Sequence, residues 1–179
     1  MRYLLTALLA SALSAATFAD DLKPVEVAGL KAKPPKEWKE KPAPTTAMGR
    51  LATIGVPAAE GSEDAEIVVF YFQGGGGTVA QNLDRQRGLF LPAEGKDKVD
   101  EKLTDTKVGT LKATCLDLSG TFKKKPSPMS DKFTAMKDYR EIYVVVEKEE
   151  GTYYIRLLGP AKTVEKNKKS FDEWLASFK

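Results

Sequence analysis

Hydrophobic and polar positions alternate along much of this chain, but residues 65–72 (AEIVVFYF) are apolar on both faces. Only a strand that is covered on both sides tolerates apolar side chains at nearly every position. Gly74–Gly77 follow, and Thr78-Val79-Ala80-Gln81 then forms the Thr-x-x-Gln pattern of a capping box, which starts a helix. We therefore predict a strand, a glycine turn and a helix over Ala65–Leu89, and the rest of the chain is organised around this unit.

A second strand that is apolar on both faces is predicted at Tyr139–Lys148 (YREIYVVVEK). An acidic turn with a glycine leads back into Thr152–Leu158, so the two segments form a hairpin that Gly159-Pro160 ends. Because both two-sided strands must lie inside the sheet, we expect Ile67–Phe72 and Ile142–Val146 to be neighbouring inner strands.

Weaker alternation predicts the remaining strands, with a polar edge strand among them. The segment Lys123–Asp138 has no clear period, two prolines and five lysines, and we expect it to be a long mobile loop. Phe90–Lys98 is also expected to be a loop. The further strands are predicted at Val25–Lys33, Met48–Val56, Val99–Lys107 (the edge) and Thr110–Thr121.

The final helix is predicted at Thr163–Phe178, where the apolar side chains fall on one stripe and the charged ones point outward. Two helices and a mostly antiparallel sheet define an α+β fold, with the sheet flanked by the helices. Trp38, a lone aromatic among charges, is expected to fold back over an edge of the core; the alternative is an exposed binding residue. The stripe consists of Val164, Phe171, Trp174, Leu175 and Phe178.

The N-terminus has the three parts of a secretory signal peptide: Arg2, an apolar run at Leu4–Ala16, and small residues before Asp20. We assign residues 1–19 to the signal peptide and 20–179 to a single domain. The apolar run is shorter than the about 20 residues that a transmembrane helix needs, and the cleavage site has no cysteine for a lipid anchor. The sequence predicts an exported, periplasmic or secreted protein without stable membrane insertion; the alternative is a cytosolic chain with an apolar start.

Charge and cysteine content exclude several classes of protein. Without residues 1–19 the chain has 27 basic and 25 acidic residues, whereas nucleic-acid binders gather positive charge on one face with aromatic platforms. We therefore expect no nucleic-acid partner. The only cysteine, Cys115, cannot form an internal disulfide. A domain of about 160 residues does not need one, because it buries roughly two thirds of its unfolded surface.

The chain contains no histidine, which excludes Ser-His-Asp and Cys-His catalysis and most catalytic zinc sites. Cys115 lies on an apolar strand face, where a free cysteine is usually an inert core residue rather than a nucleophile. The acids Glu60, Glu63 and Asp64 lack the spacing of a calcium loop, and other acids lie in turns or beside lysines, as on a solvated surface. We predict no catalytic residue, no metal site and no cofactor.

The glycine turn is the sharpest candidate for a ligand site. Glycines between a strand and a helix N-terminus gather backbone N–H groups at the positive end of the helix dipole, which suits an anion. The Lys-Ser or Lys-Thr of a phosphate-binding loop is missing. A plain flexible connection is therefore the alternative interpretation. The candidate ligand-binding residues are Gly75, Gly76, Gly77, Thr78 and Arg85, the last lying further along the same helix.

Several stretches together resemble the PsbP-like family and its structural relatives, the Ran-binding Mog proteins and the DcrB-type bacterial envelope proteins. They are Pro35-Lys36-Glu37-Trp38 after a first strand, the strand–glycine–helix unit at Ile67–Leu89, and the ending Tyr153–Lys179. The resemblance implies an α/β/α sandwich and a non-enzymatic accessory or binding role. It brings no active-site motif, and because the lipoprotein cysteine of DcrB-type members is missing, it implies no membrane tether.

The sequence thus favours an exported, non-catalytic binding or accessory protein that contacts another envelope protein or a small ligand. We expect the glycine turn and Lys123–Asp138 to make that contact. The alternative is an anion- or phosphate-ligand receptor, or an enzyme, that uses the Gly74–Thr78 turn.

Overall fold

The structure is a computed structural model that describes residues 22–42, 49–74 and 76–179. The predicted signal peptide (residues 1–19) lies outside the described residues, as does Met48, the first residue of the strand predicted at Met48–Val56. Ten strands and two helices occupy the described ranges. The strands are β1 (Val25–Val27), β2 (Leu30–Ala32), β3 (Lys39–Glu40), β4 (Arg50–Val56), β5 (Ala65–Gln73), β6 (Phe90–Leu91), β7 (Asp100–Val108), β8 (Leu111–Lys124), β9 (Thr134–Lys148) and β10 (Gly151–Pro160); the helices are α1 (Val79–Arg87) and α2 (Ala161–Ala176).

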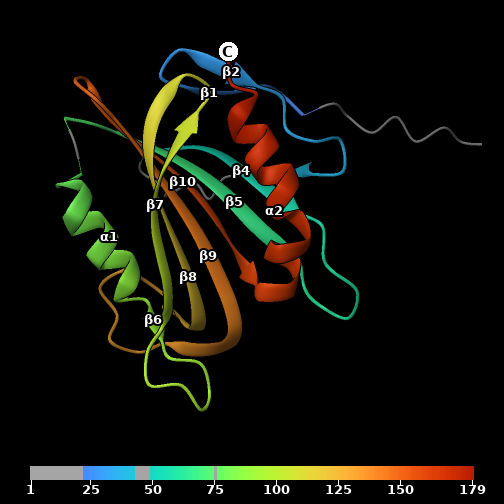
Figure 1. Cartoon of the computed structure of the whole chain (residues 1–179), viewed down its shortest axis with the longest axis vertical. Coiled ribbons are helices and arrows are strands. Elements are labelled where there is room, and N and C mark those ends of the chain that lie inside the picture. Colours follow the sequence, from blue (N-terminus) through green and yellow to red (C-terminus); the bar gives the residue numbers. More distant parts are fainter. Residues whose placement is uncertain (1–21, 43–48, 75) are drawn as a thin grey trace, which may run out of the picture.

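Eight of these strands form one antiparallel sheet in the order β3-β4-β5-β10-β9-β8-β6, with β7 paired to β8, while β1 and β2 form a separate hairpin. The predicted α+β class with a mostly antiparallel sheet is therefore confirmed. Helices α1 and α2 lie on opposite sides of the sheet (Figure 1). The predicted polar edge strand is also confirmed, because β7 pairs with β8 and with no other described strand.

The two central segments, Ile67–Phe72 and Ile142–Val146, are inner strands as predicted, but they are not neighbours. Strand β10 lies between them, with Ile155 opposite Val69 of β5 and opposite Val144 of β9. A tight hairpin fixes β10 beside β9, and β5 then pairs with the free edge of that hairpin. Two-sided burial therefore identifies a strand as internal without identifying its partner.

Several predicted boundaries are wrong for local reasons. Val25–Lys33 is not one strand but the β1–β2 hairpin, because Ala28 (φ 49°) and Gly29 (φ 82°) turn the chain in its middle. The strand predicted at Thr152–Leu158 is longer: β10 also includes Gly159 and Pro160, which pair with Arg140 and Tyr139, and it ends at Pro160 as α2 begins. Phe90–Lys98 begins with the short strand β6, which pairs with the end of β8.

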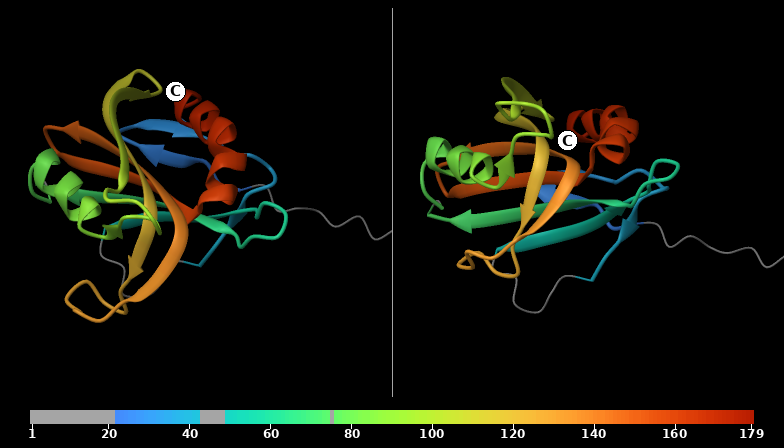
Figure 2. Two further views of the ribbon diagram at one scale, coloured as in Figure 1. Left: turned by 60° about the horizontal axis from the view of Figure 1, so that its bottom comes forward. Right: turned by 90° about the horizontal axis from the view of Figure 1, so that it is seen from below.

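The segment Lys123–Asp138 is mostly strand at its two ends, so the prediction of a long loop there is wrong. Strand β8 continues to Lys124, β9 begins at Thr134, and these two residues are directly paired. Only residues 125–133 connect the strands. Backbone hydrogen bonds hold these strand ends together without a buried face, so no hydrophobic period marks them. The paired ends project from the body of the sheet (Figure 2).

Alternate residues of the central strands build two separate cores. Ile142 and Val144 of β9 face the core under α2, whereas Tyr143 and Val145 face the core under α1. The five-residue stripe predicted for the last helix is buried against the first of these cores. Trp38 is 2% exposed and packs edge-on against Trp174, with ring centroids 5.7 Å apart, so its predicted covering role is confirmed.

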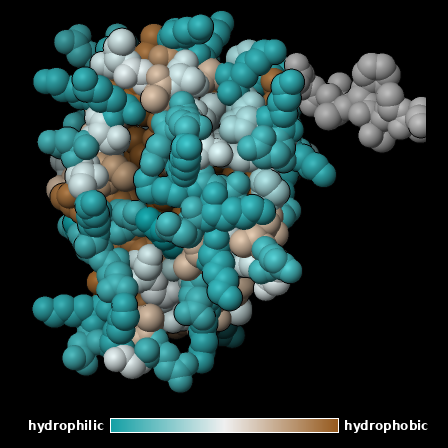
Figure 3. All heavy atoms as spheres, turned by 45° about the vertical axis from the view of Figure 1, so that its right-hand side comes forward, coloured by the Kyte–Doolittle hydropathy of each residue, from teal (hydrophilic) through white to brown (hydrophobic). Residues whose placement is uncertain are grey.

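The surface around α2 is polar. Space-filling atoms on this side of the molecule are mainly hydrophilic, with apolar atoms visible only in small areas (Figure 3). Neither of the two described helices is long and apolar enough to cross a membrane.

We expect Phe171→Ala to lower the free energy of unfolding by about 3–5 kcal/mol, because the fully buried Phe171 ring would leave a cavity between α2 and the sheet. The two tryptophans, Trp38 and Trp174, report on this interface, so urea denaturation followed by fluorescence measures the change. The control Leu103→Ala, at a side chain 51% exposed on β7, should stay within about 0.5 kcal/mol of the wild type. Equal losses in both variants would contradict this account of the core.

Candidate functional site

Helix α1 covers its face of the sheet with few apolar contacts. Its buried residues are Asn82, Leu83 and Gln86, of which only Leu83 is apolar. A polar contact fastens its C-terminal end, where Arg87 forms ion pairs with Asp84 and with Glu101 of β7. Because burial of apolar side chains is the main force that seats a helix, α1 is held far more weakly than α2.

The sheet beneath α1 contains a buried carboxyl group, Glu141 of β9, which is 0% exposed. Neither of its oxygens accepts a hydrogen bond from a described residue. The nearest cation is Arg156 of β10, whose Nε lies 3.9 Å from Glu141 Oε1, too far for a hydrogen bond. Burial raises the pKa of Glu141 to about 7, and the attraction of Arg156 only partly offsets this.

The preceding residue shows what a satisfied charge looks like in this sheet. Arg140 points to the α2 face, where Nε and a terminal nitrogen donate to the two oxygens of Asp117 at 2.8 and 2.7 Å. The same guanidinium also pairs with Glu165 of α2. Arg140 is thus fully engaged and ties α2 to the sheet, whereas Glu141, one residue later and on the other face, has no such partner.

Other buried polar atoms beneath α1 share this property. Gln86 Oε1, the Tyr154 hydroxyl and Arg156 Nε are buried and form no hydrogen bond with a described residue. With the two oxygens of Glu141, they make five unpaired polar atoms on the side of the sheet that carries α1. We call these four residues, Gln86, Glu141, Tyr154 and Arg156, the α1 polar cluster. Such atoms are rare in folded proteins, where they are normally bound to water or a ligand.

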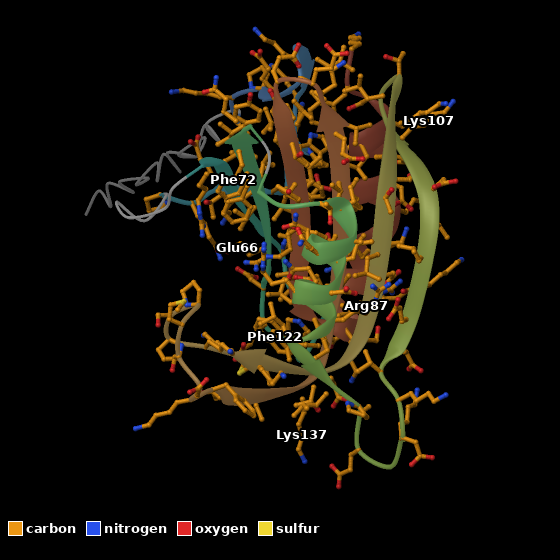
Figure 4. The ribbon with its side chains drawn as sticks, turned by 90° about the vertical axis from the view of Figure 1, so that its left-hand side faces the viewer. Glu66, Phe72, Arg87, Lys107, Phe122 and Lys137 are labelled. Atoms are coloured by element: carbon orange, nitrogen blue, oxygen red, sulfur yellow. The ribbon has the colours of Figure 1, made fainter. Side chains whose placement is uncertain are left out.

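Strand register explains how the charges of the cluster come together. Leu158 of β10 lies opposite both Glu141 of β9 and Glu66 of β5, so Arg156, two residues earlier on the same face, lies diagonally between the two glutamates. Glu66 lies toward the start of β5 and Phe72 toward its end (Figure 4). The cluster approaches the surface on the β5 side, where Glu66 is partly exposed.

An aromatic row connects the cluster to the glycine turn. The ring of Tyr154 stacks on Tyr143, with centroids 5.7 Å apart, and meets Phe72 edge-on at 5.9 Å. A side chain at Gly76 would place its Cβ 3.3 Å from the Tyr154 hydroxyl, so the turn passes directly over this group. Burial raises the pKa values of Tyr143 and Tyr154, which remain neutral hydrogen-bond donors at physiological pH.

The predicted glycine site is occupied largely by its own hydrogen bonds. The capping box is confirmed: Gln81 N–H donates to Thr78 Oγ1, and Thr78 N–H donates to Gln81 Oε1. The amide of Asn82 donates to the carbonyls of Gly76, Gly77 and Thr78. The capping box thus uses the backbone N–H groups of Thr78 and Gln81, which an anion at the helix N-terminus would need. The anion site stays a prediction.

The remaining predicted residues fall on either side of this turn. Gly75 lies outside the described residues. Arg85 is exposed and donates to Asn82 Oδ1 at 2.7 Å, so it supports the residue that holds the turn. Gly77, with φ 93°, adopts a left-handed conformation that favours glycine. The structure therefore brings Gly76, Gly77 and Thr78 together.

The α1 polar cluster offers both donors and acceptors around a carboxyl group that is half ionised near neutral pH. Acid–base chemistry at Glu141 would require substrate access, but the side chain is 0% exposed. No group of three or more metal-ligating side chains occurs among the described residues. The arrangement is therefore suited to hold a small polar molecule once α1 moves.

Cys115 lies apart from this cluster. Its side chain packs against the α2 core, and burial, followed by the negative charge of Asp117, raises its pKa to about 11. The thiol thus remains protonated at physiological pH, which makes it a poor nucleophile.

A hollow of about 470 Å³ lies elsewhere, beside the start of β1, and is lined in part by Tyr71 and Tyr153, whose rings are tilted at 36° to each other. Its charged residues, Lys23, Glu26 and Glu40, are all exposed to solvent. No unpaired buried group lines it, so it gives no reason to expect a particular ligand.

The sequence analysis did not identify Glu141 or Arg156. Both are charged residues inside strands predicted to be buried, and that conflict was the available signal: a two-sided strand buries its charged residues too. Gln86 carried no such signal, because its position facing the sheet depends on how α1 is seated.

Comparison with known proteins addresses the fold. No protein-family model matches the sequence, and no curated protein is significantly similar to it. The solution structure of cyanobacterial PsbP (CyanoP) from Synechocystis sp. PCC 6803 is similar, with 11% identity and a TM-score of 0.54 over 94% of this chain and 97% of that chain. The crystal structure of PA94, a protein of unknown function from Pseudomonas aeruginosa, shows 12% identity and a TM-score of 0.51, covering 87% and 94%.

LpqN of Mycobacterium tuberculosis, involved in cell envelope biogenesis, superimposes less well: 17% identity and a TM-score of 0.45, covering 87% of this chain and 86% of that chain. At such low identities the first two likenesses show the fold alone. The chain has the PsbP-like fold that the sequence resemblance implied.

We expect Glu141→Gln to abolish much of the pH dependence of stability. Burial raises the folded-state pKa of Glu141 to about 7, from an ordinary value of 4.5. Below about pH 4.5 the carboxyl group is neutral in both states, and the folded protein has its full stability. As the pH rises from 4.5 to 7, the unfolded state ionises first, so the free energy of unfolding falls. Wild type should lose about 3 kcal/mol over this interval, and the variant should not. Urea denaturation at a series of pH values measures both curves.

The matched control is Glu147→Gln, an exposed glutamate on the same strand, which should follow the wild-type curve. Parallel curves for wild type and Glu141→Gln would show that Glu141 titrates normally, and the account of its burial would fail.

Proposed function

We propose that this chain is an exported, non-catalytic accessory protein that binds a small polar ligand beneath α1. The observation behind the proposal is the set of five unpaired polar atoms in the α1 polar cluster. Leaving such atoms unpaired costs about 1–3 kcal/mol for each group, and a ligand that pairs with them recovers part of that cost. Binding would therefore be favoured by groups that the protein already presents.

The chemistry of the cluster narrows the class of ligand. Glu141 and Gln86 present oxygens that need hydrogen-bond donors, whereas Arg156 presents a donor that needs an acceptor. A small molecule with a cationic or hydroxyl donor on one side and an anionic acceptor on the other fits this pattern, as in a free amino acid. Arg156 Nε and Glu141 Oε1 lie 3.9 Å apart, so one small molecule beside them could contact both groups.

Access depends on movement of α1. The helix is bounded by glycines at both ends, Gly77 before its N-cap and Gly88 at its C-cap, and it buries one apolar side chain. The α1 helix is thus the part of the fold with the lowest cost of displacement, as expected of elements that open for ligands. When it closes again, Gln86 and Leu83 return over the bound molecule.

Two features support the non-catalytic and exported parts of the proposal. The chain has no histidine, and the thiol of Cys115 stays protonated on the opposite face from the cluster. The signal-peptide pattern at residues 1–19 supports export to the periplasm or outside the cell. Contact with another envelope protein has less support, because the exposed large apolar side chains come from four different strands and the β8–β9 connection.

We expect one or more free amino acids to raise the melting temperature of the wild-type protein. At 100 times Kd a ligand adds about 2.7 kcal/mol of stability, which corresponds to roughly 5–10 °C for a domain of this size. Thermal unfolding in a panel of amino acids, neutral sugars and inorganic phosphate measures the shift. Glu141→Gln and Arg156→Met should each abolish it, because each removes one half of the recognition.

The control Glu147→Gln should retain the full shift. A phosphate-dependent rise that Arg85→Met abolishes and Glu141→Gln preserves would instead support the anion receptor at the glycine turn. No shift with any member of the panel would contradict both.

A further inference from the structure

The β8–β9 hairpin carries a projecting tip, which we call the basic arm and define as residues 123–133. The arm stands out from the body of the sheet at the end opposite Lys107 (Figure 4). Its turn is ordered by local hydrogen bonds: Ser130 N–H donates to the Ser127 carbonyl, and Lys132 N–H donates to Ser130 Oγ, both at 3.1 Å. The arm is therefore a shaped protrusion at one end of the molecule.

Apolar side chains occupy the tip of this arm, where the fold gives them nothing to cover. Met129 is 92% exposed, the highest value among the large apolar residues that are exposed, and Phe133 is 44% exposed. Among the described residues, the only cation over the Phe133 ring is Lys123, whose Nζ lies 6.0 Å from the ring centroid. An apolar side chain with this exposure at a protruding tip indicates a contact surface.

The arm is also strongly basic. It contains Lys123, Lys124, Lys125 and Lys132 against a single acid, Asp131. None of these four lysines forms an ion pair with a described residue. Lys137, four residues beyond the arm, shows the contrast, because it is paired with Glu94 at 2.8 Å. The positive charge of the arm is thus available to a partner.

We propose that the basic arm docks the protein on an anionic lipid surface. Met129 and Phe133 enter the boundary between headgroups and acyl chains, and the lysines reach the lipid phosphates through their long stems. Two apolar side chains give shallow, reversible attachment, unlike a membrane-spanning segment. The arm lies outside the α1 polar cluster, so docking and ligand binding are separate properties of the chain.

Shape and composition favour lipid over an acidic protein. A protein interface usually has a close-packed core that is depleted in lysine, whereas this arm is narrow and convex, and four of its eleven residues are lysines. A fluid headgroup layer adapts to such a tip and offers many phosphates at once. Each lysine at an anionic surface changes affinity about fivefold, and the effect decreases with salt because charges beyond about 8 Å are screened at physiological ionic strength.

Sedimentation with vesicles tests the proposal. The full chain should bind vesicles of phosphatidylglycerol and phosphatidylcholine, bind those of phosphatidylcholine alone far less, and detach when salt is added. Lys124→Glu with Lys132→Glu should weaken binding at least 25-fold, at about fivefold for each lysine, and Met129→Asp should weaken it as well. Any binding by residues 1–19 is common to all these proteins and cancels in the comparison.

The matched control is Lys107→Glu with Lys112→Glu, which makes the same change in net charge at the opposite end of the sheet, where the two lysines are paired across β7 and β8. This variant should bind the mixed vesicles about as well as the wild type. Circular dichroism checks that every variant remains folded, as exposed substitutions should.

Three outcomes would overturn the proposal: no preference for phosphatidylglycerol, an equal loss in the arm and control variants, or full binding by the arm variants. Soluble polyglutamate tests the protein alternative. If polyglutamate binds the arm more tightly than vesicles of equal charge do, and Met129→Asp leaves that binding unchanged, the partner is an acidic protein rather than a lipid.

Discussion

Burial of the central strands on both faces is the constraint on which the rest of this structure depends. In each of strands β5, β10 and β9, alternate side chains enter the core under α2, and the side chains between them face the α1 side of the sheet. Each face needs a cover, and α2 and α1 provide one each. Charged residues in the covered middle of these strands have little or no access to water, which is why the partners of Arg140 and Glu141 matter.

The two faces have opposite characters. Under α2 the packing is apolar, with Phe171, Trp174 and Trp38 in ring contact, and the charged Arg140 is fully paired. Under α1 the apolar core is smaller, and the polar atoms around Glu141 are not satisfied by described residues. The α2 face therefore supplies most of the stability, and the α1 face sacrifices some of it. Such a sacrifice is typical of sites kept for function.

The same sheet separates the proposed ligand site from the proposed docking arm. The α1 polar cluster lies at the middle of the central strands, whereas the basic arm is an extension of β8 and β9 beyond the covered part of the sheet. Strand β9 begins at the basic arm and carries Glu141 further along, so one strand connects both regions. Glu141 lies seven residues beyond the start of β9, so attachment through the arm would not by itself cover the ligand site.

The sequence by itself determined the elements whose signals are local: the two-sided strands at 65–72 and 139–148, the capping box at Thr78, and the apolar stripe of the last helix. It also determined the α+β class, because these patterns leave few ways to bury the apolar faces. Only the tertiary structure decided which strands are neighbours, that the two ends of residues 123–138 are paired, and that Glu141, Arg156 and Gln86 lie on the same side of the sheet. Those outcomes depend on register between segments distant in sequence, and no periodicity within one segment encodes the partner on the other side of a sheet.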